Sequence, residues 1–105
     1  MRIIAKSTLK KYWEDNPQAE PSLLEWLDIV SECEWETPNE VKSTFGNASL
    51  LGNSRVIFNI KGNDYRLITK IDYKNKIIFT VWIGTHSEYD KIQVKNIEYV
   101  KTNKN

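Results

Sequence analysis

The spacing of apolar residues changes along the chain, from a helical repeat before residue 47 to an alternating repeat after it. The apolar run over residues 1–5 predicts a short opening strand. Ser7 is then expected to cap a first helix, because its side chain can accept a bond from a free backbone N–H. That helix should end at Asn16-Pro17, since proline disfavours helical angles in its predecessor.

Two more helices are predicted before residue 47. One begins at Pro21, where a missing N–H costs nothing, and carries an apolar stripe of Leu23, Leu27 and Val30 with Leu24 and Trp26 on its flanks. The other follows the capping-box pattern Thr37-Pro38-Asn39-Glu40 and should stop at Gly46. These helices are expected to cover a core containing Trp13, Trp26 and Trp35.

Alternation of apolar and polar residues predicts strands after residue 47. Val56, Phe58 and Ile60 alternate with polar neighbours, and Gly62-Asn63 suits the positive φ angles of a two-residue hairpin. The return strand spans 64–72, with Tyr65, Leu67 and Ile71 alternating against Arg66 and Lys70. After a turn at Lys74-Asn75, the nearly continuous apolar run 77–84 is expected to be the central strand.

This element order predicts an α+β fold, with an N-terminal strand and helices packed on one face of a small antiparallel sheet. A chain of 105 residues has room for one core, so residues 1–105 should form a single domain. Residues 93–105 are expected to be either an added edge strand or a mobile tail.

Charge is divided unevenly between the two halves. Residues 1–50 hold five basic and nine acidic side chains, whereas residues 51–105 hold ten basic and five acidic ones. Such a split indicates a second half that faces a polyanion. The single cysteine, Cys33, excludes an internal disulfide, and no apolar run is long enough to cross a membrane; a cytoplasmic protein without membrane contact is therefore expected.

Several kinds of site are excluded by composition. One histidine and one cysteine do not supply a zinc or iron site, and the four glycines are not spaced as a phosphate-binding loop, so neither a metal nor a cofactor is expected. What remains is the stretch 84–91, where Thr85 and Glu88 have capping-box spacing and predict a helical turn from His86. Partial positive charge at a helix start favours neutral histidine, which suits a proton acceptor, although a merely exposed histidine is an equally simple interpretation.

Basic side chains flank the predicted hairpin. Arg66, Lys61 and Lys91 could share the open side of the sheet, where a guanidinium can hold a phosphate with two parallel bonds. Tyr65 and Tyr89 lie between them in sequence, and exposed rings stack on unpaired bases. The alternative is a solvated basic face whose tyrosines pack into the core.

Two long segments resemble the HigB family of RelE-like bacterial toxins, and the resemblance covers residues 1–92. The start of the chain and the region around Trp35-Glu36-Thr37-Pro38 fit the same family, whereas Trp82 and the tail from Gln93 depart from its pattern. The segments are Phe58-Asn59-Ile60-Lys61-Gly62-Asn63-Asp64-Tyr65-Arg66-Leu67-Ile68 and Gly84-Thr85-His86-Ser87-Glu88-Tyr89-Asp90-Lys91.

This resemblance implies the toxin of a toxin–antitoxin module: a metal-independent endoribonuclease that cuts messenger RNA on the translating ribosome. It implies a HigA-type helix-turn-helix antitoxin as partner, with operator DNA bound only through that antitoxin. The 2′-hydroxyl of the RNA would be the nucleophile, leaving a 2′,3′-cyclic phosphate.

The resemblance also implies roles for individual residues. Arg66 would hold the phosphate, His86 would act as general base or acid, and Tyr89 would transfer a second proton or stack. Substrate-binding residues would include Lys61 and Lys91 at flanking phosphates, Asn59 and Asn63 at backbone or sugar, and Tyr65.

Two other functions stay open from the sequence. The same fold occurs in ParE-like toxins, which poison a topoisomerase without cutting RNA. An RNA-binding module without catalysis would also have a basic sheet face.

Overall fold

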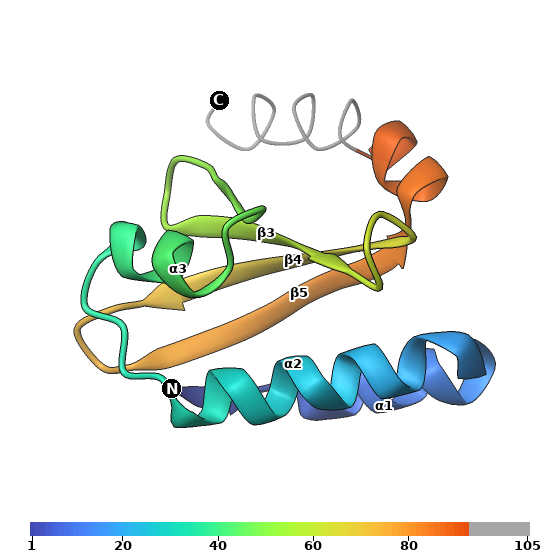
Figure 1. Ribbon diagram of the computed structural model, residues 1–105, viewed down its shortest axis with the longest axis horizontal. Helices are drawn as coiled ribbons and strands as arrows, with labels where there is room; N and C mark the ends of the chain where they lie inside the picture. The colour runs from blue at the N-terminus through green and yellow to red at the C-terminus, as the bar shows by residue number, and fades with distance from the viewer. Residues whose placement is uncertain (93–105) are drawn as a thin grey trace, which may run out of the picture.

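A five-stranded sheet carries helices against one of its two faces (Figure 1). The computed structural model describes residues 1–92, and within them no helix is long and apolar enough to cross a membrane. The strand order across the sheet is β1-β5-β4-β3-β2. The elements are β1 (Arg2–Ile4), α1 (Lys6–Asp15), a 3-10 turn η1 (Pro17–Ala19), α2 (Glu20–Glu32), α3 (Pro38–Thr44), β2 (Ser49–Leu50), β3 (Arg55–Ile60), β4 (Tyr65–Asp72) and β5 (Ile77–Thr85).

The α+β prediction is confirmed, but the sheet is mixed rather than wholly antiparallel. β1 runs parallel to β5, with Ile3 opposite Ile78, while the other pairs are antiparallel. β5 has a neighbour on both sides, yet β4 is the central strand, so the predicted position of 77–84 is one place off. Burial on both faces does not explain the apolar run of β5, because Phe79 and Val81 on this strand are 38% and 50% exposed.

The core lies between the sheet and α1 and α2. Phe58 on β3 is 1% exposed and forms the centre of an aromatic cluster, with ring centroids 5.4 Å from Trp26, 6.3 Å from Trp35 and 5.1 Å from Phe45. Trp13 is partly buried and packs against this core. The predicted tryptophan-containing core is therefore confirmed.

The first two helices differ in detail from the prediction. Ala5, with φ 70°, precedes α1, and no side chain caps the helix, so the predicted cap at Ser7 is wrong. The hydroxyl of Thr80 on β5 donates to the carbonyl of Ala5 at 2.8 Å and fixes this sharp turn out of β1 instead. In α2 the buried residues are Leu23, Trp26 and Val30, so Trp26 belongs to the apolar stripe rather than to its flank. Leu24, on the other flank, is 44% exposed.

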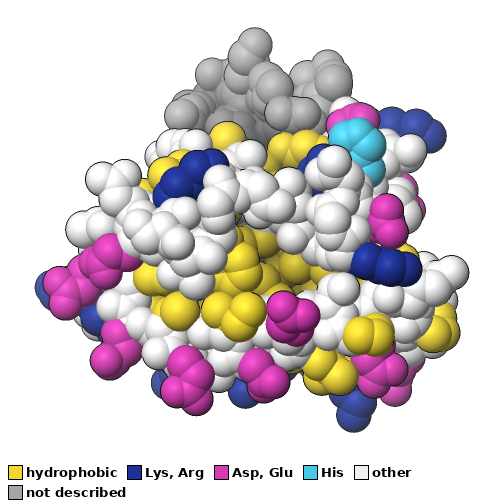
Figure 2. Space-filling view, viewed as in Figure 1, with side chains coloured by type: hydrophobic (Ala, Val, Ile, Leu, Met, Phe, Trp, Pro, Cys, Tyr) yellow, Lys and Arg dark blue, Asp and Glu magenta, His cyan; other side chains and the backbone are white. Residues whose placement is uncertain are grey.

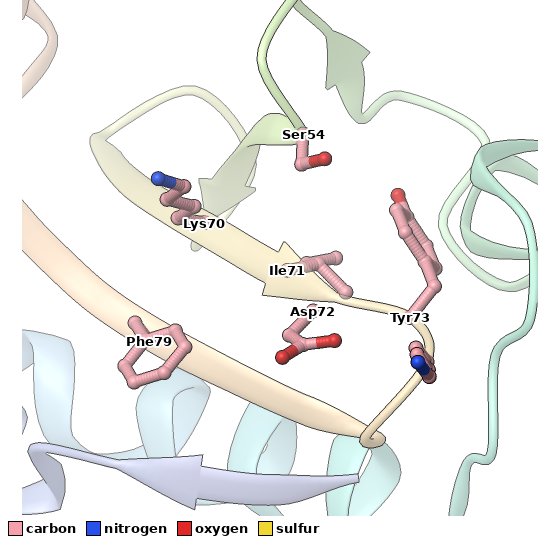
Figure 3. A pocket seen from close by; sticks show the side chains of 7 residues that line it. Ser54, Lys70, Ile71, Asp72, Tyr73 and Phe79 are labelled. Carbon is pink, nitrogen blue, oxygen red and sulfur yellow. The ribbon is translucent and has the colours of Figure 1, made fainter.

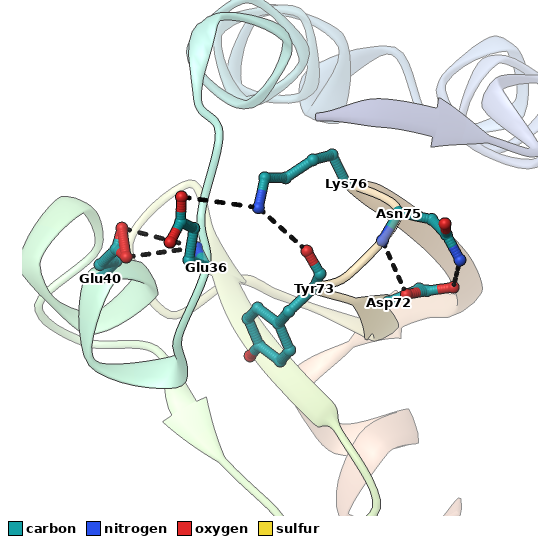
Figure 4. Close-up of polar contacts among 6 residues, drawn as sticks. All are labelled: Glu36, Glu40, Asp72, Tyr73, Asn75 and Lys76. Atoms are coloured by element: carbon teal, nitrogen blue, oxygen red, sulfur yellow. Dashed lines mark hydrogen bonds and ion pairs between the residues drawn. The ribbon is translucent and has the colours of Figure 1, made fainter.

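The third helix begins at the predicted cap. Thr37 accepts a bond from the backbone N–H of Glu40, and Pro38 occupies the first turn. The Glu40 carboxylate accepts from the N–H of Glu36 at 3.2 Å, one residue before the position that a capping box would use (Figure 4). Glu36 also forms an ion pair of 4.0 Å with Lys76, which ties this helix start to the turn between β4 and β5 (Figure 4).

The hairpin between β3 and β4 is longer than predicted. Ile60 pairs with Tyr65, so the loop holds four residues, and its positive φ angles are at Lys61 (53°) and Gly62 (65°). Asn63 therefore does not occupy the left-handed position expected of it.

The two-residue strand β2 was not predicted, because two residues are too few to show alternation. The strand or tail predicted for residues 93–105 lies outside the described residues, and the single domain over 1–105 stays a prediction.

Candidate active site

One row of residues crosses the sheet on the face opposite α1 and α2. Asn59, Arg66 and Gly84 are cross-strand partners on β3, β4 and β5. Their chain neighbours Phe58 and Leu67 are buried in the core. Because successive side chains of a strand point to opposite faces, Asn59 and Arg66 point away from the helices.

Arg66 is held in place by the hairpin beside it. Its Nη1 donates to the carbonyls of Asn63 at 3.2 Å and Tyr65 at 3.3 Å. These bonds use one terminal nitrogen and leave the Nε and Nη2 edge of the guanidinium for another acceptor. A guanidinium edge fixed in this way matches two oxygens of a phosphate.

A helical segment over residues 86–92 follows β5 directly, on the side of the sheet opposite α1 and α2 (Figure 1). The predicted capping box is confirmed: Glu88 donates its N–H to Thr85 Oγ1 at 3.2 Å, and the Glu88 carboxylate accepts from the Thr85 N–H at 2.8 Å. The N–H of His86 donates to the carbonyl of Asp64 at 3.0 Å. The helix start is therefore attached to the same hairpin loop that holds Arg66.

His86 lies at the surface at the beginning of this segment. Its side chain is 53% exposed, and Nε2 is 3.5 Å from the Asp90 carboxylate, one helical turn further on. The only histidine of the sequence is visible at the surface in Figure 2, in cyan. Asp90 was not identified from the sequence, although its i+4 spacing from His86 could have indicated it.

Tyr89 links this helical segment to Arg66. Its ring centroid is 6.4 Å from that of Trp82 on β5. Burial raises the pKa of Tyr89, the positive charge of Arg66 partly opposes this, and Asp90 adds to it. The net effect keeps the phenol protonated, so Tyr89 is suited to donating a proton or a hydrogen bond near Arg66.

One predicted site residue lies on the wrong side of the sheet. Tyr65 points to the helix-covered face, is 7% exposed, and packs edge-on against Tyr12 with centroids 5.8 Å apart. The alternation of β4 already grouped Tyr65 with Leu67 and Ile71 on the apolar side. Its prediction as a ring that stacks on bases is therefore corrected, because a side chain buried in the core does not reach a substrate on the other face.

The remaining predicted residues are Asn59, which belongs to the row, and Lys61, Asn63 and Lys91, which lie around it. Lys61 is in the hairpin loop, 3.9 Å from Asp64, and Asn63 contributes its carbonyl to Arg66. The Asn59 amide donates to the Asn47 carbonyl at 3.5 Å. Lys91 is exposed two positions after Tyr89, which is about half a turn around the helix, so it points away from Tyr89.

A hollow on the described surface lies away from this site. A shallow pocket of about 720 Å³ lies at the far end of β4 and β5, and none of the predicted site residues lines it (Figure 3). Lys70, one of its lining residues, is four positions along β4 from Arg66, about 13 Å away for an extended strand. Among residues 1–92, no group of three or more side chains could hold a metal ion. Arg66, His86 and Tyr89 stay the predicted catalytic residues.

Comparison with known proteins identifies the family of this chain. Residues 19–92, which contain all three of these side chains, match the family described as HigB_toxin, RelE-like toxic component of a toxin-antitoxin system. The mRNA interferase HigB of Escherichia coli O6:H1 is 29% identical over 94 residues, covering 88% of this chain and 91% of the relative. The mRNA interferase HigB of Shigella flexneri is 25% identical over 93 residues, covering 86% and 88%. Since the family match spans well over half of the sequence, the chain belongs to the HigB family of RelE-like toxins.

Proposed function

We propose that this chain is an endoribonuclease that cuts messenger RNA on the translating ribosome, without a metal, and is neutralised by a HigA-type antitoxin. The observation that carries the proposal is that one hairpin loop binds both Arg66, through the Asn63 carbonyl, and the helix start that presents His86, through the Asp64 carbonyl. Two relatives named mRNA interferase, similar along nearly their whole length, support the choice of substrate.

Arg66 would neutralise the charge that builds on the phosphate being attacked. Its bonds to the Asn63 and Tyr65 carbonyls hold the guanidinium before substrate arrives, so little reorganisation is needed. Donors fixed in advance at the site of developing charge commonly make the largest contribution to catalysis.

His86 and Tyr89 would move the two protons of the reaction. His86 in its neutral form takes the proton of the 2′-hydroxyl as the oxygen attacks phosphorus. The bond from phosphorus to the 5′-oxygen breaks, and Tyr89 donates the proton that this leaving oxygen needs. The products are a 2′,3′-cyclic phosphate and a free 5′-hydroxyl, and solvent exchange restores both side chains.

The raised pKa of Tyr89 supports this division of roles. A phenol held in its protonated form is a poor base but an available acid, whereas an exposed imidazole can accept a proton. Asp90 would orient the imidazole and stabilise the imidazolium formed when the proton is taken.

Cleavage of a translated reporter transcript tests the proposal. Wild-type chain should cut the transcript, and Arg66→Ala and His86→Ala should each lose about 10²-fold or more of the rate. Lys10→Ala is the matched control, because Lys10 is an exposed cation on α1, behind the other face of the sheet. Full activity of both site variants would refute the assignment.

Two further experiments test the nature of the substrate and the need for ribosomes. A 2′-deoxy sugar at the cleavage position should stop cutting, and omission of ribosomes should reduce it strongly, while a chelator should have no effect. Growth arrest with DNA damage and intact transcripts would indicate a topoisomerase poison. Binding of RNA without cleavage would indicate a non-catalytic module.

A further inference from the structure

The indole of Trp82 lies across the backbone of Gly84. A Cβ atom at residue 84 would be 2.4 Å from Cη2 and 2.6 Å from Cζ2 of Trp82, closer than real Cβ contacts occur, and 3.0 Å from Oε1 of Glu88. The φ angle of Gly84 is not in the left-handed region, so its conformation does not require a glycine. What requires it is the space that the indole occupies.

This position brings the indole next to the proposed phosphate site. Gly84 is the cross-strand partner of Arg66, and the ring that lies over it is 6.4 Å from Tyr89, tilted by 46°. Cross-strand neighbours on one face are about 5 Å apart, a distance that a single nucleotide can span. Trp82 is partly exposed, so part of its ring remains available.

Packing explains part of this arrangement, because Trp82 is the cross-strand partner of Ile68, which is 3% exposed on the same face of the sheet. The core tryptophans Trp26 and Trp35 are 2% and 3% exposed on the helix-covered face, and Trp82 belongs to neither that cluster nor that face. Tyr65, the ring expected to stack on a base, is buried with them. Trp82 and Tyr89 are therefore the aromatic side chains that the described residues place beside Arg66.

We propose that Trp82 is a substrate-positioning residue, on whose indole stacks a base of single-stranded RNA next to the phosphate bound by Arg66. The inference rests on the proposed function and adds a base-binding surface to it. Every base has a flat face that can stack, so Trp82 would set the register of the strand, with a preference for purines, whose larger rings stack more strongly.

Cleavage kinetics of four variants test this role. Trp82→Leu removes the ring, and Gly84→Ala displaces it without removing it. Each should raise KM about 10-fold or more with kcat changed less than about threefold, since stacking on an aromatic ring is worth that much per base. The double variant should be no worse than either single one, because both remove the same contact. Trp82→Phe, which keeps a smaller ring, should recover part of the loss.

Binding of an uncleavable 2′-O-methyl RNA gives a readout that does not depend on catalysis. Stacking on the indole should quench tryptophan fluorescence in the wild type and in the control Trp13→Phe, which changes a partly buried ring on α1. Trp82→Phe should remove this quenching. Thermal unfolding of each variant checks that it is folded.

The outcomes separate this inference from the function on which it rests. If wild-type chain fails to cut transcripts, the proposed function fails, and the fluorescence arm still tests stacking. If quenching persists in Trp82→Phe, or if Trp82→Leu and Gly84→Ala keep the wild-type KM and cleavage sites, the stacking role is overturned.

Discussion

Replacing Arg66 by lysine tests whether the phosphate is held by charge alone or by two parallel bonds. In the structure Nη1 is occupied by two carbonyls, so one edge of the guanidinium, Nε with Nη2, remains for the substrate. A lysine at residue 66 retains the positive charge but offers a single point of contact. The substitution therefore removes one charge-assisted hydrogen bond and leaves the electrostatic attraction.

The expected cost follows from that count. One hydrogen bond to a charged group contributes about 1.5–3 kcal/mol, which corresponds to a loss of about 10- to 150-fold in kcat/KM for Arg66→Lys. Arg66→Gln removes the charge as well and should lose about 10³-fold. Both variants should unfold within about 1 kcal/mol of the wild type, because the two bonds that Arg66 makes are only partly buried.

Cleavage of a reporter transcript over a range of substrate concentrations measures these ratios. Arg55→Lys is the matched control: Arg55 lies on the same face of the sheet, opposite Lys70, and should tolerate the exchange within about twofold. Equal activity of Arg66→Lys and wild type would refute the two-bond geometry. Equal loss in Arg66→Lys and Arg66→Gln would show instead that charge at this position is not used.

Three further predictions concern stability. Phe58→Ala should lower the free energy of unfolding by about 3–5 kcal/mol, measured in denaturant, because it empties the centre of the aromatic cluster. Burial, with smaller contributions from Glu88 and Tyr65, raises the pKa of Tyr12 from 10.0 to about 12. The folded state therefore holds this proton more tightly, so stability should be constant below about pH 10 and fall as pH rises toward 12, with a smaller fall in Tyr12→Phe. Thr85→Val removes the side-chain cap and should speed hydrogen exchange of the Glu88 amide about fivefold, for a cap worth about 1 kcal/mol, whereas Thr85→Ser should retain protection.

Local patterns predicted the features that depend on near neighbours in sequence. The caps at Thr37 and Thr85 were predicted because a capping side chain and its partner are three residues apart. The two faces of β3 and β4 followed from alternation, which placed Arg66 away from the core. The same alternation should have excluded Tyr65 from the site. Tyr65 was predicted to stack on a base because it is an aromatic residue among basic ones, although its position in the strand placed it on the apolar face.

Features that depend on distant parts of the chain were beyond such reasoning. Nothing local indicates that the three residues of β1 pair parallel with β5, or that the Thr80 hydroxyl replaces a side-chain cap at the start of α1. The indole of Trp82 over Gly84 was missed for a related reason. Trp82 and Gly84 are two residues apart, which puts them on the same face of the strand. Whether the indole lies along the strand over Gly84 depends on the rotamer of Trp82, which the sequence does not indicate.

The parallel pairing of β1 with β5 makes the order of synthesis matter. It joins segments about 75 positions apart, as the bond from Thr80 to Ala5 does, and contacts of such long sequence separation close a large loop and form late in folding. A nascent chain that ends before residue 77 lacks the partner of β1 together with the strand that leads to His86 and Tyr89. The candidate site and the sheet that supports it are therefore completed by the same late segment, so a chain truncated before residue 77 would lack both the complete sheet and the helix start that presents His86.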